Sequence, residues 1–200
     1  MMLPTHAMVG LALATPVSLL APEIAPAALT GSLAGSVAPD LDLYAGHRRT
    51  LHYPTLYALV AFPALVGALL VPVGVSVAVA AFLVAATTHC RMDRYGGGLE
   101  LRPWEATSER AVYDHVRARW RRPKRWIRYD GSPGDLAALS ALGIPLWVVL
   151  DGPFQLVAGL ALAVGSVYAL LRRRLASFAP VIVGYAPSRV RRYVPDRYRL

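Results

Sequence analysis

The sequence predicts an all-α, polytopic integral membrane protein with about six apolar helices arranged in three hairpins. Hydrophobic residues make up 56% of the 200-residue chain and charged residues only 16%, and the apolar residues are concentrated in runs, as in membrane proteins. All 21 Lys and Arg residues can also be placed on one side of a membrane, and basic residues tend to stay cytoplasmic. We therefore expect a multi-pass protein of the cell membrane whose basic loops and tail are cytoplasmic.

The net charge of +9 is compatible with lipid or nucleic-acid partners. Because the basic stretches adjoin apolar segments and form no separate basic domain, we favour anionic headgroups of membrane lipids and expect no nucleic acid. Cys90 is the only cysteine, so an intramolecular disulfide is excluded, and we leave it out of the candidate site. The oligomeric state is not predicted.

Proline and glycine residues divide the apolar sequence into helices. Pro22 and Pro26 mark the first turn, Pro39 ends the second segment, and Pro72 with Gly74 marks the next turn. Only the last segment comfortably reaches the length of about 20 apolar residues that a membrane-spanning helix needs. Some of the others are therefore expected to be tilted, partly submerged or re-entrant. The predicted helices cover approximately residues 6–20, 25–38, 55–71, 73–89, 135–150 and 152–171.

Two local patterns support this division. Gly31 and Gly35 form a small-xxx-small pair, which predicts that the second helix closely approaches another helix. Ser132, Pro133 and Asp135 form a helix start, with a hydroxyl cap, a proline at the first position and an acid in the first turn.

The chain divides into a helical membrane domain, residues 1–171, and a basic C-terminal tail, residues 172–200. A polar, aromatic-rich cytoplasmic insert interrupts the membrane domain at residues 90–134. Valine and tryptophan side chains recur within this insert at helical spacing. They predict a helix from about Glu109 to Trp120, which either lies in the headgroup layer or packs on the ends of the membrane helices.

Histidine and aspartate residues gather at the helix ends that face the basic side. His89 and Asp93 are four residues apart, so on a continuing helix they share one face and can bind one ion. Ionisable residues at the end of an apolar segment are costly unless they serve a site. This pair is therefore the core of a predicted site.

Asp40 and Asp42 form a Pro-Asp-Leu-Asp turn at the end of the second helix. Two carboxylates in one turn can converge on a cation such as Zn, Mn or Mg. The alternative is a solvated helix end at which Arg48 and Arg49 compensate the acidic pair.

Besides His89, three histidines lie near these carboxylates in the sequence or at the same membrane side. His47 and His52 follow the paired aspartates within twelve residues, which favours a metal site over isolated surface histidines. His6 is in the first turn of the first helix, where the positive helix end favours the neutral imidazole that a metal requires. His115 lies between arginines in the insert and is interpreted as a surface residue.

Imidazoles and carboxylates in this mixture suit a divalent metal, with zinc preferred and manganese as the second choice. Such an ion acidifies a bound water and polarises a phosphoryl or carbonyl oxygen. A carboxylate that is not a ligand, Asp40 or Asp42, can then act as general base. Arg48, Arg91 and Arg94 are the candidates for holding an anionic substrate group beside the metal.

These residues together resemble a known family. The matching pieces are Pro-Thr-His at residues 4–6, Pro-Asp-Leu-Asp at 39–42, His47-Arg48, Thr50, His52 and the His89-x-x-x-Asp93 motif. In combination they resemble the YdjM-like family of membrane-bound metal-dependent hydrolases, over roughly residues 4–93. The chain departs from the family at the loop, where Leu51 intervenes between Thr50 and His52, and Tyr53 stands where serine is usual.

The resemblance implies a metal-dependent hydrolase. The order of ligands is also similar to that of zinc-dependent phospholipase C and P1-type nucleases, although a further His and Glu set for another zinc is not identifiable. Carried over to this chain, His6 would lie near a second zinc. One zinc would be held by Asp40 or Asp42, His52, His89 and Asp93.

We therefore expect a membrane-embedded metal-dependent hydrolase that acts on a phosphoester or another ester at the level of the lipid headgroups. Two alternatives remain open. The polar cluster can serve ion or proton transport in a non-enzymatic membrane protein. The basic insert and tail can instead recruit partners to a membrane scaffold.

Overall fold

The computed structural model of the chain describes residues 1–194 and residue 198. It is mostly helical, as predicted, with a short two-stranded sheet in the insert. Three helices, α1, α4 and α6, are long and apolar enough to cross a membrane, whereas α3 and α5 are apolar but shorter. The elements are α1 (Leu3–Leu20), α2 (Ala25–Val37), η1 (Ala38–Tyr44), α3 (Pro54–Leu70), α4 (Gly74–Tyr95), η2 (Pro103–Glu105), β1 (Val112–Asp114), β2 (Arg119–Arg121), α5 (Pro133–Val149), α6 (Gly152–Tyr185) and α7 (Ser188–Arg191).

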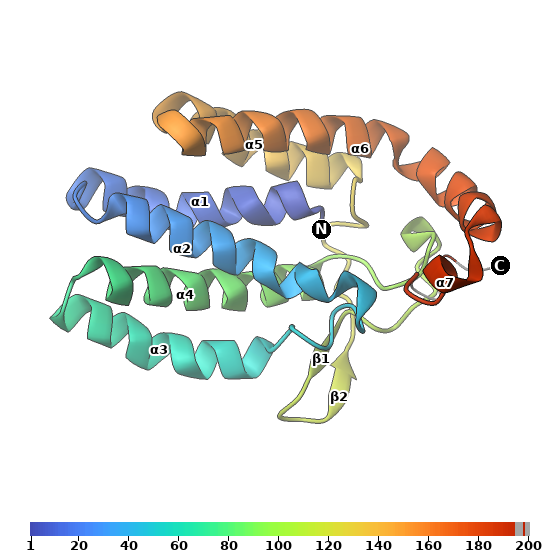
Figure 1. Ribbon diagram of the computed structural model, residues 1–200, viewed down its shortest axis with the longest axis horizontal. Helices are drawn as coiled ribbons and strands as arrows, with labels where there is room; N and C mark the ends of the chain where they lie inside the picture. Colours follow the sequence, from blue (N-terminus) through green and yellow to red (C-terminus); the bar gives the residue numbers. More distant parts are fainter. Residues whose placement is uncertain (195–197, 199–200) are drawn as a thin grey trace.

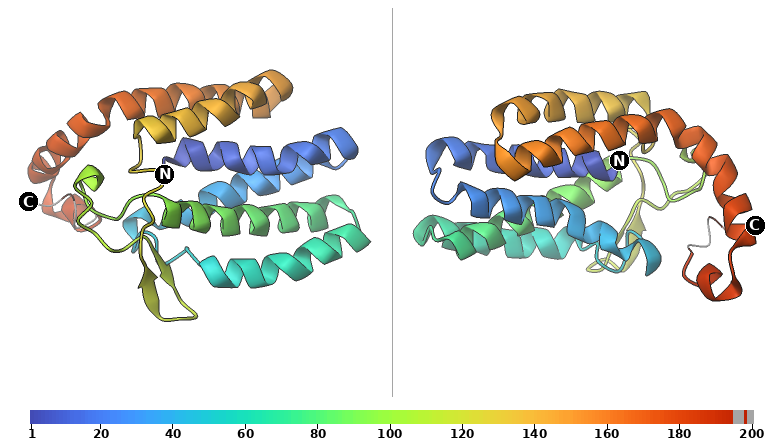
Figure 2. Two further views of the ribbon diagram at one scale, coloured as in Figure 1. Left: turned by 180° about the vertical axis from the view of Figure 1, so that it is seen from behind. Right: turned by 45° about the horizontal axis from the view of Figure 1, so that its top comes forward.

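Helices α1 to α6 pack as three antiparallel hairpins, α1 with α2, α3 with α4 and α5 with α6 (Figure 1). The turns within these hairpins lie together at one end of the molecule. The N-terminus, the η1 segment, the insert and the C-terminal region lie at the opposite end, and Figure 2 shows the same arrangement from two further directions. The polar segments of the sequence are thereby gathered at one end of an apolar helix bundle.

The closest helix contact joins α2 to α4, as the small-residue pair predicts. A Cβ atom added to Gly31 would overlap the carbonyl oxygen of Ala78, and one added to Gly35 would overlap that of Phe82. The contact of α2 with α1 is also close, because the Ser32 hydroxyl donates a 2.6 Å hydrogen bond to the carbonyl of a glycine in α1. Helix α2 is therefore fixed between α1 and α4.

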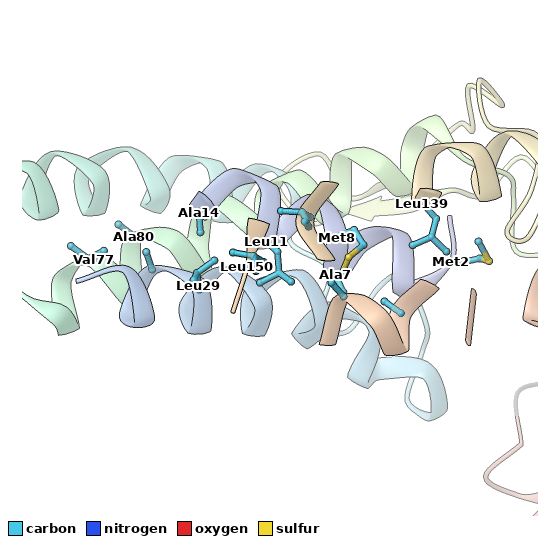
Figure 3. Close-up of a cluster of buried hydrophobic side chains, with 14 of the residues drawn as sticks. Met2, Ala7, Met8, Leu11, Ala14, Leu29, Val77, Ala80, Leu139 and Leu150 are labelled. Atoms are coloured by element: carbon cyan, nitrogen blue, oxygen red, sulfur yellow. The ribbon is translucent and has the colours of Figure 1, made fainter. Parts of the chain in front are cut away.

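The apolar core runs along the inside of the bundle and is centred on α1, which contacts α2, α4, α5 and α6. Met8 and Leu11 of α1 are fully buried and pack in one cluster with Leu29 of α2, Val77 of α4 and Leu139 of α5 (Figure 3). The core thus holds together the helices whose polar ends form the site described below.

The predicted helix from Glu109 to Trp120 is wrong. This segment forms the antiparallel hairpin of β1 and β2, in which Tyr113 lies opposite Trp120 with their rings 5.5 Å apart. Valine, tyrosine and tryptophan favour strands, and such aromatic pairs across strands stabilise a sheet.

The side chain of Asp114 explains why the chain turns at this point. Its Oδ1 atom accepts hydrogen bonds from the backbone N–H groups of Val116 and Arg117 at 3.1 and 3.3 Å. Its Oδ2 atom accepts from Nε of Arg121 at 2.9 Å. Aspartate bonds of this kind stabilise turns and compete with helix formation, so the weak helical stripe is overridden.

The last helix is longer than predicted. It was expected to end at Leu171, but α6 continues to Tyr185. Arg172 lies inside this helix, and its Nε donates a 2.9 Å hydrogen bond to Asp130 of the insert. The basic side chains after Leu171 therefore begin on a helix that also contacts the insert.

Candidate metal centre

Four predicted site residues meet where α4 reaches the insert. Asp40 comes from η1, His52 from the loop before α3, and His89 and Asp93 from one face of α4. One potential ligand atom from each residue lies within 4.8 Å of the others. His52, His89 and Asp93 are almost completely buried, whereas the side chain of Asp40 is 20% exposed. The chain thus builds a His2Asp2 cluster that could hold a metal ion.

The distances within the cluster match those between ligands of a tetrahedral metal ion. Oδ1 of Asp40 is 3.4 Å from Nε2 of His89 and 3.6 Å from Nε2 of His52. Oδ2 of Asp93 is 3.5 and 3.1 Å from the same two nitrogens. Zinc binds nitrogen and oxygen at about 2.0–2.2 Å, and a tetrahedron with such bonds separates its ligands by roughly 3.3–3.6 Å. The four separations centre on this range.

Backbone carbonyl groups fix the orientation of two histidine rings. Nδ1–H of His89 donates to the carbonyl of Ser36 at 2.7 Å, and Nδ1–H of His6 donates to that of Met2 at 2.9 Å. A carbonyl only accepts, so Nδ1 must carry the hydrogen, and in the neutral ring Nε2 is left with a lone pair. Both Nε2 atoms are buried without a hydrogen-bond partner among the described residues. Such atoms fit a site that receives a cation.

His6 lies beside the four residues and faces the same carboxylate. Its Nε2 is 3.5 Å from Oδ1 of Asp93, and its ring stacks on that of His89 with centroids 4.0 Å apart. Asp135 anchors this part of α1, because its carboxylate accepts hydrogen bonds from the N–H of Met2 and the hydroxyl of Thr5, both at 2.8 Å. The capping pattern predicted at Ser132 is present and holds the start of α5.

Asp42 was predicted as a ligand or catalytic base, but the structure gives it a different role. Its Oδ2 accepts a 2.9 Å hydrogen bond from Nδ1–H of His52, on the ring side opposite the cluster. Backbone N–H groups of Arg48, Arg49 and Leu51 also donate to its two oxygens at 3.1–3.2 Å. Asp42 therefore orients His52 and folds the loop, as carboxylates behind metal-binding histidines commonly do.

His47 lies at the edge of the cluster. Its Nδ1 is 3.1 Å from Oδ1 of Asp42 and 3.9 Å from Oδ1 of Asp40, and its side chain is 16% exposed. The ring is thus closer to the supporting carboxylate than to the potential ligand atoms. His115, predicted to be a surface residue, lies outside the cluster and contacts the backbone carbonyl of Arg49.

Of the three arginines predicted to hold a substrate group, only Arg48 lies beside the cluster. Arg48 is buried beside the cluster, with Nη2 3.2 Å from Oδ1 of Asp93 and Nη1 donating to the Gly97 carbonyl at 2.9 Å. Arg91 and Arg94 instead line a second cavity, between α3, α4 and the β hairpin. They lie about 200° and 100° around α4 from Asp93, given 3.6 residues per turn, and so cannot share its face.

A cavity with a volume of about 70 Å³ opens beside the cluster. It is lined by Asp40, Arg48 and Asp93, and by two residues that were not predicted, Glu100 and Arg172. Both carboxylate oxygens of Glu100 are buried and lack a hydrogen-bond partner within the described part of the chain. Sequence spacing gives no signal for Glu100. Arg172 follows the last apolar run directly, which is a weak signal that could have been noticed.

Burial and hydrogen bonding shift the pKa values of the residues in the loop. Burial would raise the pKa of Asp42, but hydrogen bonds from His47 and His52 hold it well below its usual range. Burial likewise opposes ionisation of Asp40, and interaction with His89 lowers its pKa below the usual range. For His52, burial lowers the pKa, but hydrogen bonding to Asp42 and Asp93 outweighs this effect and raises it above 6.5. The loop carboxylates thus remain charged at neutral pH.

No protein-family model, curated protein or solved structure matches this chain in comparisons with known proteins. The donor set is therefore the basis for a functional conclusion. Imidazole nitrogens and carboxylate oxygens together are typical ligands of zinc and manganese.

Proposed function

We propose that the protein is a membrane-bound metal-dependent hydrolase of phosphoesters or related esters, with zinc as the preferred ion and manganese as the alternative. Asp40, His52, His89 and Asp93 would hold the ion, and His6 would lie beside it. The residues that carry the resemblance to the YdjM-like hydrolases are also those that approach one another. We infer membership of that family on this ground.

The observation that carries the proposal is the convergence of histidine Nε2 atoms on two carboxylates. Lone pairs of His6 and His89 that face charged oxygens of Asp40 and Asp93 repel one another unless a cation or protons lie between them. The separations of 3.4–3.6 Å suit one small tetrahedral ion. Support from behind each ring, by a carbonyl or by Asp42, is the arrangement that fixes metal-binding histidines.

The cavity beside the cluster supplies groups that suit hydrolysis of an anionic ester. A bound divalent ion would lower the pKa of a water and polarise a phosphoryl oxygen. Glu100, whose carboxylate oxygens have no hydrogen-bond partner among the described residues, would accept the proton of the attacking water. Arg48 and Arg172 line the same cavity and would hold the negatively charged oxygens of the substrate.

We propose that helices α1 to α6 are all embedded in the membrane, with the basic end cytoplasmic. Large apolar side chains remain exposed on the outer helices, for example Leu69 and Leu170 at 75% and 79%. Lipid tails would cover such a surface. The metal cluster would then lie at headgroup depth, which favours a lipid or another amphiphilic ester as substrate.

The core below the cluster favours hydrolysis over ion transport. Going from His6 and His89 toward the opposite end, the buried side chains of α1, α2 and α4 are mainly apolar, among them Leu11, Leu29 and Val77. An ion crossing this region would find few groups to replace its water shell. The polar groups instead open toward the basic end through the cavity.

The test combines metal content with hydrolysis. We would measure zinc and manganese in detergent-purified protein by elemental analysis, and hydrolysis of a chromogenic phosphodiester and of phospholipids in mixed micelles. The variants are the double substitution His89→Ala with Asp93→Ala, and Asp40→Asn, whose partly exposed side chain makes misfolding less of a concern. His115→Ala is the matched control, because this histidine lies outside the cluster.

We expect near-stoichiometric metal in the wild type and in His115→Ala, and loss of both metal and hydrolysis in the cluster variants. Absence of metal from the wild type after reconstitution would overturn the metal centre. If the protein binds metal, hydrolyses no ester and conducts ions in liposomes, the hydrolase proposal would be overturned in favour of ion transport. Metal binding that Asp40→Asn and the double variant leave unchanged would place the ion elsewhere.

A further inference from the structure

The second cavity has a basic lining that the metal site does not use. It has a volume of about 370 Å³ and lies between the start of α3, the end of α4 and the β hairpin. Arg91, Arg94 and Arg121 line it together with the apolar side chains of Leu59 and Val112. One cavity thus combines guanidinium groups with an apolar wall.

Two of these arginines carry charges that no described residue neutralises. Arg121 is paired, because its Nε donates a 2.9 Å hydrogen bond to Asp114. Arg91 and Arg94 form no side-chain hydrogen bond or ion pair within the described residues. Nε of Arg94 is moreover buried without a hydrogen-bond partner among the residues that the structure describes, and a buried guanidinium donor left in this state is costly. An anion in the cavity would compensate the positive charges of both arginines.

The surroundings of the cavity place the anion at the boundary between apolar and polar surface. Leu59, on the outer side of α3, is 63% exposed. At the adjoining end of α4, Nζ of Lys124 lies 4.6 Å from the ring centre of Tyr95 and 5.4 Å from that of Trp126. Trp126 is 75% exposed. Aromatic and basic side chains gather in this way at the headgroup layer of a membrane.

We propose that this cavity binds the phosphate group of an anionic phospholipid, independently of the metal centre. Arg91 and Arg94 would hold the phosphate oxygens, since guanidinium groups match phosphate geometry and bind it by charge-assisted hydrogen bonds. The acyl chains would lie against Leu59 and the outer face of α3. The bound lipid would join α3, α4 and the hairpin at the basic end of the bundle.

The test measures lipid binding to the purified full chain by native mass spectrometry. The probes are phosphatidylglycerol, phosphatidylcholine and inorganic phosphate. The double substitution Arg91→Gln with Arg94→Gln is compared with Arg189→Gln with Arg191→Gln, which removes the same charge from exposed positions of α7. A further variant, Leu59→Gln, changes only the apolar wall.

We expect the wild type and the α7 variant to retain phosphatidylglycerol in preference to phosphatidylcholine. Loss of the two charge-assisted contacts in the cavity variant should weaken this binding by about tenfold or more, and Leu59→Gln should weaken it less. Equal binding by the cavity variant and the wild type would overturn the proposal. So would a loss that the α7 variant reproduces in full, since net charge alone would then explain it.

Inorganic phosphate distinguishes the two possible sources of the anion. If phosphate alone binds with the same arginine dependence and phosphatidylglycerol does not, the ligand is a soluble phosphate and the lipid assignment is overturned. Metal content and thermal unfolding are measured on each variant. In detergent without added lipid, the cavity variant should keep its metal and its unfolding temperature, which separates failure of this proposal from failure of the metal centre.

Discussion

His52 is held between two carboxylates through its two ring nitrogens. Nδ1 lies 2.9 Å from an oxygen of Asp42, and Nε2 lies 3.1 Å from an oxygen of Asp93. The first contact fixes the hydrogen on Nδ1 and the plane of the ring, and the second faces the potential metal position. The two aspartates thus play different roles although both contact the same imidazole.

This division predicts the effect of Asp42→Asn. An amide cannot accept from all the backbone N–H groups that Asp42 binds and from His52 as well, so the loop and the ring should lose their fixed orientation. We expect zinc affinity to fall by roughly 10–100-fold, as for other residues that support metal ligands. Competition with a fluorescent chelator would measure it. An unchanged affinity would contradict the supporting role.

The metal-free protein should depend on pH through His52. Its pKa in the folded protein lies above 6.5, so the protonated ring stabilises the fold below pH 6.5, and this contribution is lost as the pH rises through the folded-state pKa. Thermal unfolding in chelator should therefore show a stability that decreases over this window. With zinc the trend should reverse, because a ligand imidazole must be deprotonated. A metal-free stability that increases with pH in the same window would contradict this role of His52.

The contact of α2 with α4 predicts opposite effects for two glycine substitutions. In Gly35→Ala the new methyl group would overlap the Phe82 carbonyl, and such overpacking costs about 1–3 kcal/mol. The added Cβ of Gly67→Ala has nothing within 4 Å, and alanine in a helix interior is favoured by about 0.5–1 kcal/mol. Chemical unfolding in micelles would compare them. Similar values for both variants would mean that the helices can separate freely.

Arg172 should affect substrate binding if the proposed function holds. It lines the cavity of the metal cluster, so Arg172→Gln should raise KM by about tenfold through loss of a charge-assisted contact, with a smaller change in kcat. Arg173→Gln is the matched control, because Arg173 is the exposed neighbour on the same helix. Steady-state kinetics with an anionic ester would measure both, and equal effects would exclude a specific role.

The helices were predictable because proline, glycine and apolar runs act locally. The hairpin of β1 and β2 could not be predicted, because the spacing of Val112, Val116 and Trp120 also fits a helix. Strand pairing was decided by contacts of Asp114 with Thr55 and Arg121, which lie 59 and 7 residues away. Where the spacing of apolar residues in a short segment fits both a helix and a strand, such tertiary contacts decide between the two.

Much of the candidate site followed from spacing, since His89 and Asp93 share a face on α4 as expected. The different roles of Asp40 and Asp42 could not be predicted from spacing, because they depend on how η1 and the following loop fold around the carboxylate of Asp42. The sequence alone could have shown that Arg91 and Arg94 do not lie beside the metal cluster. A helical wheel places neither on the face of Asp93.

The main-chain carbonyls behind His6 and His89 have a consequence for the study of this protein. The carbonyls of Met2 and Ser36 orient the two rings, and every amino acid supplies such a carbonyl. Replacement of either side chain therefore leaves the acceptor in place. Alanine scanning and sequence variation among relatives would both pass over these two positions, although the geometry of the centre depends on where their backbone lies.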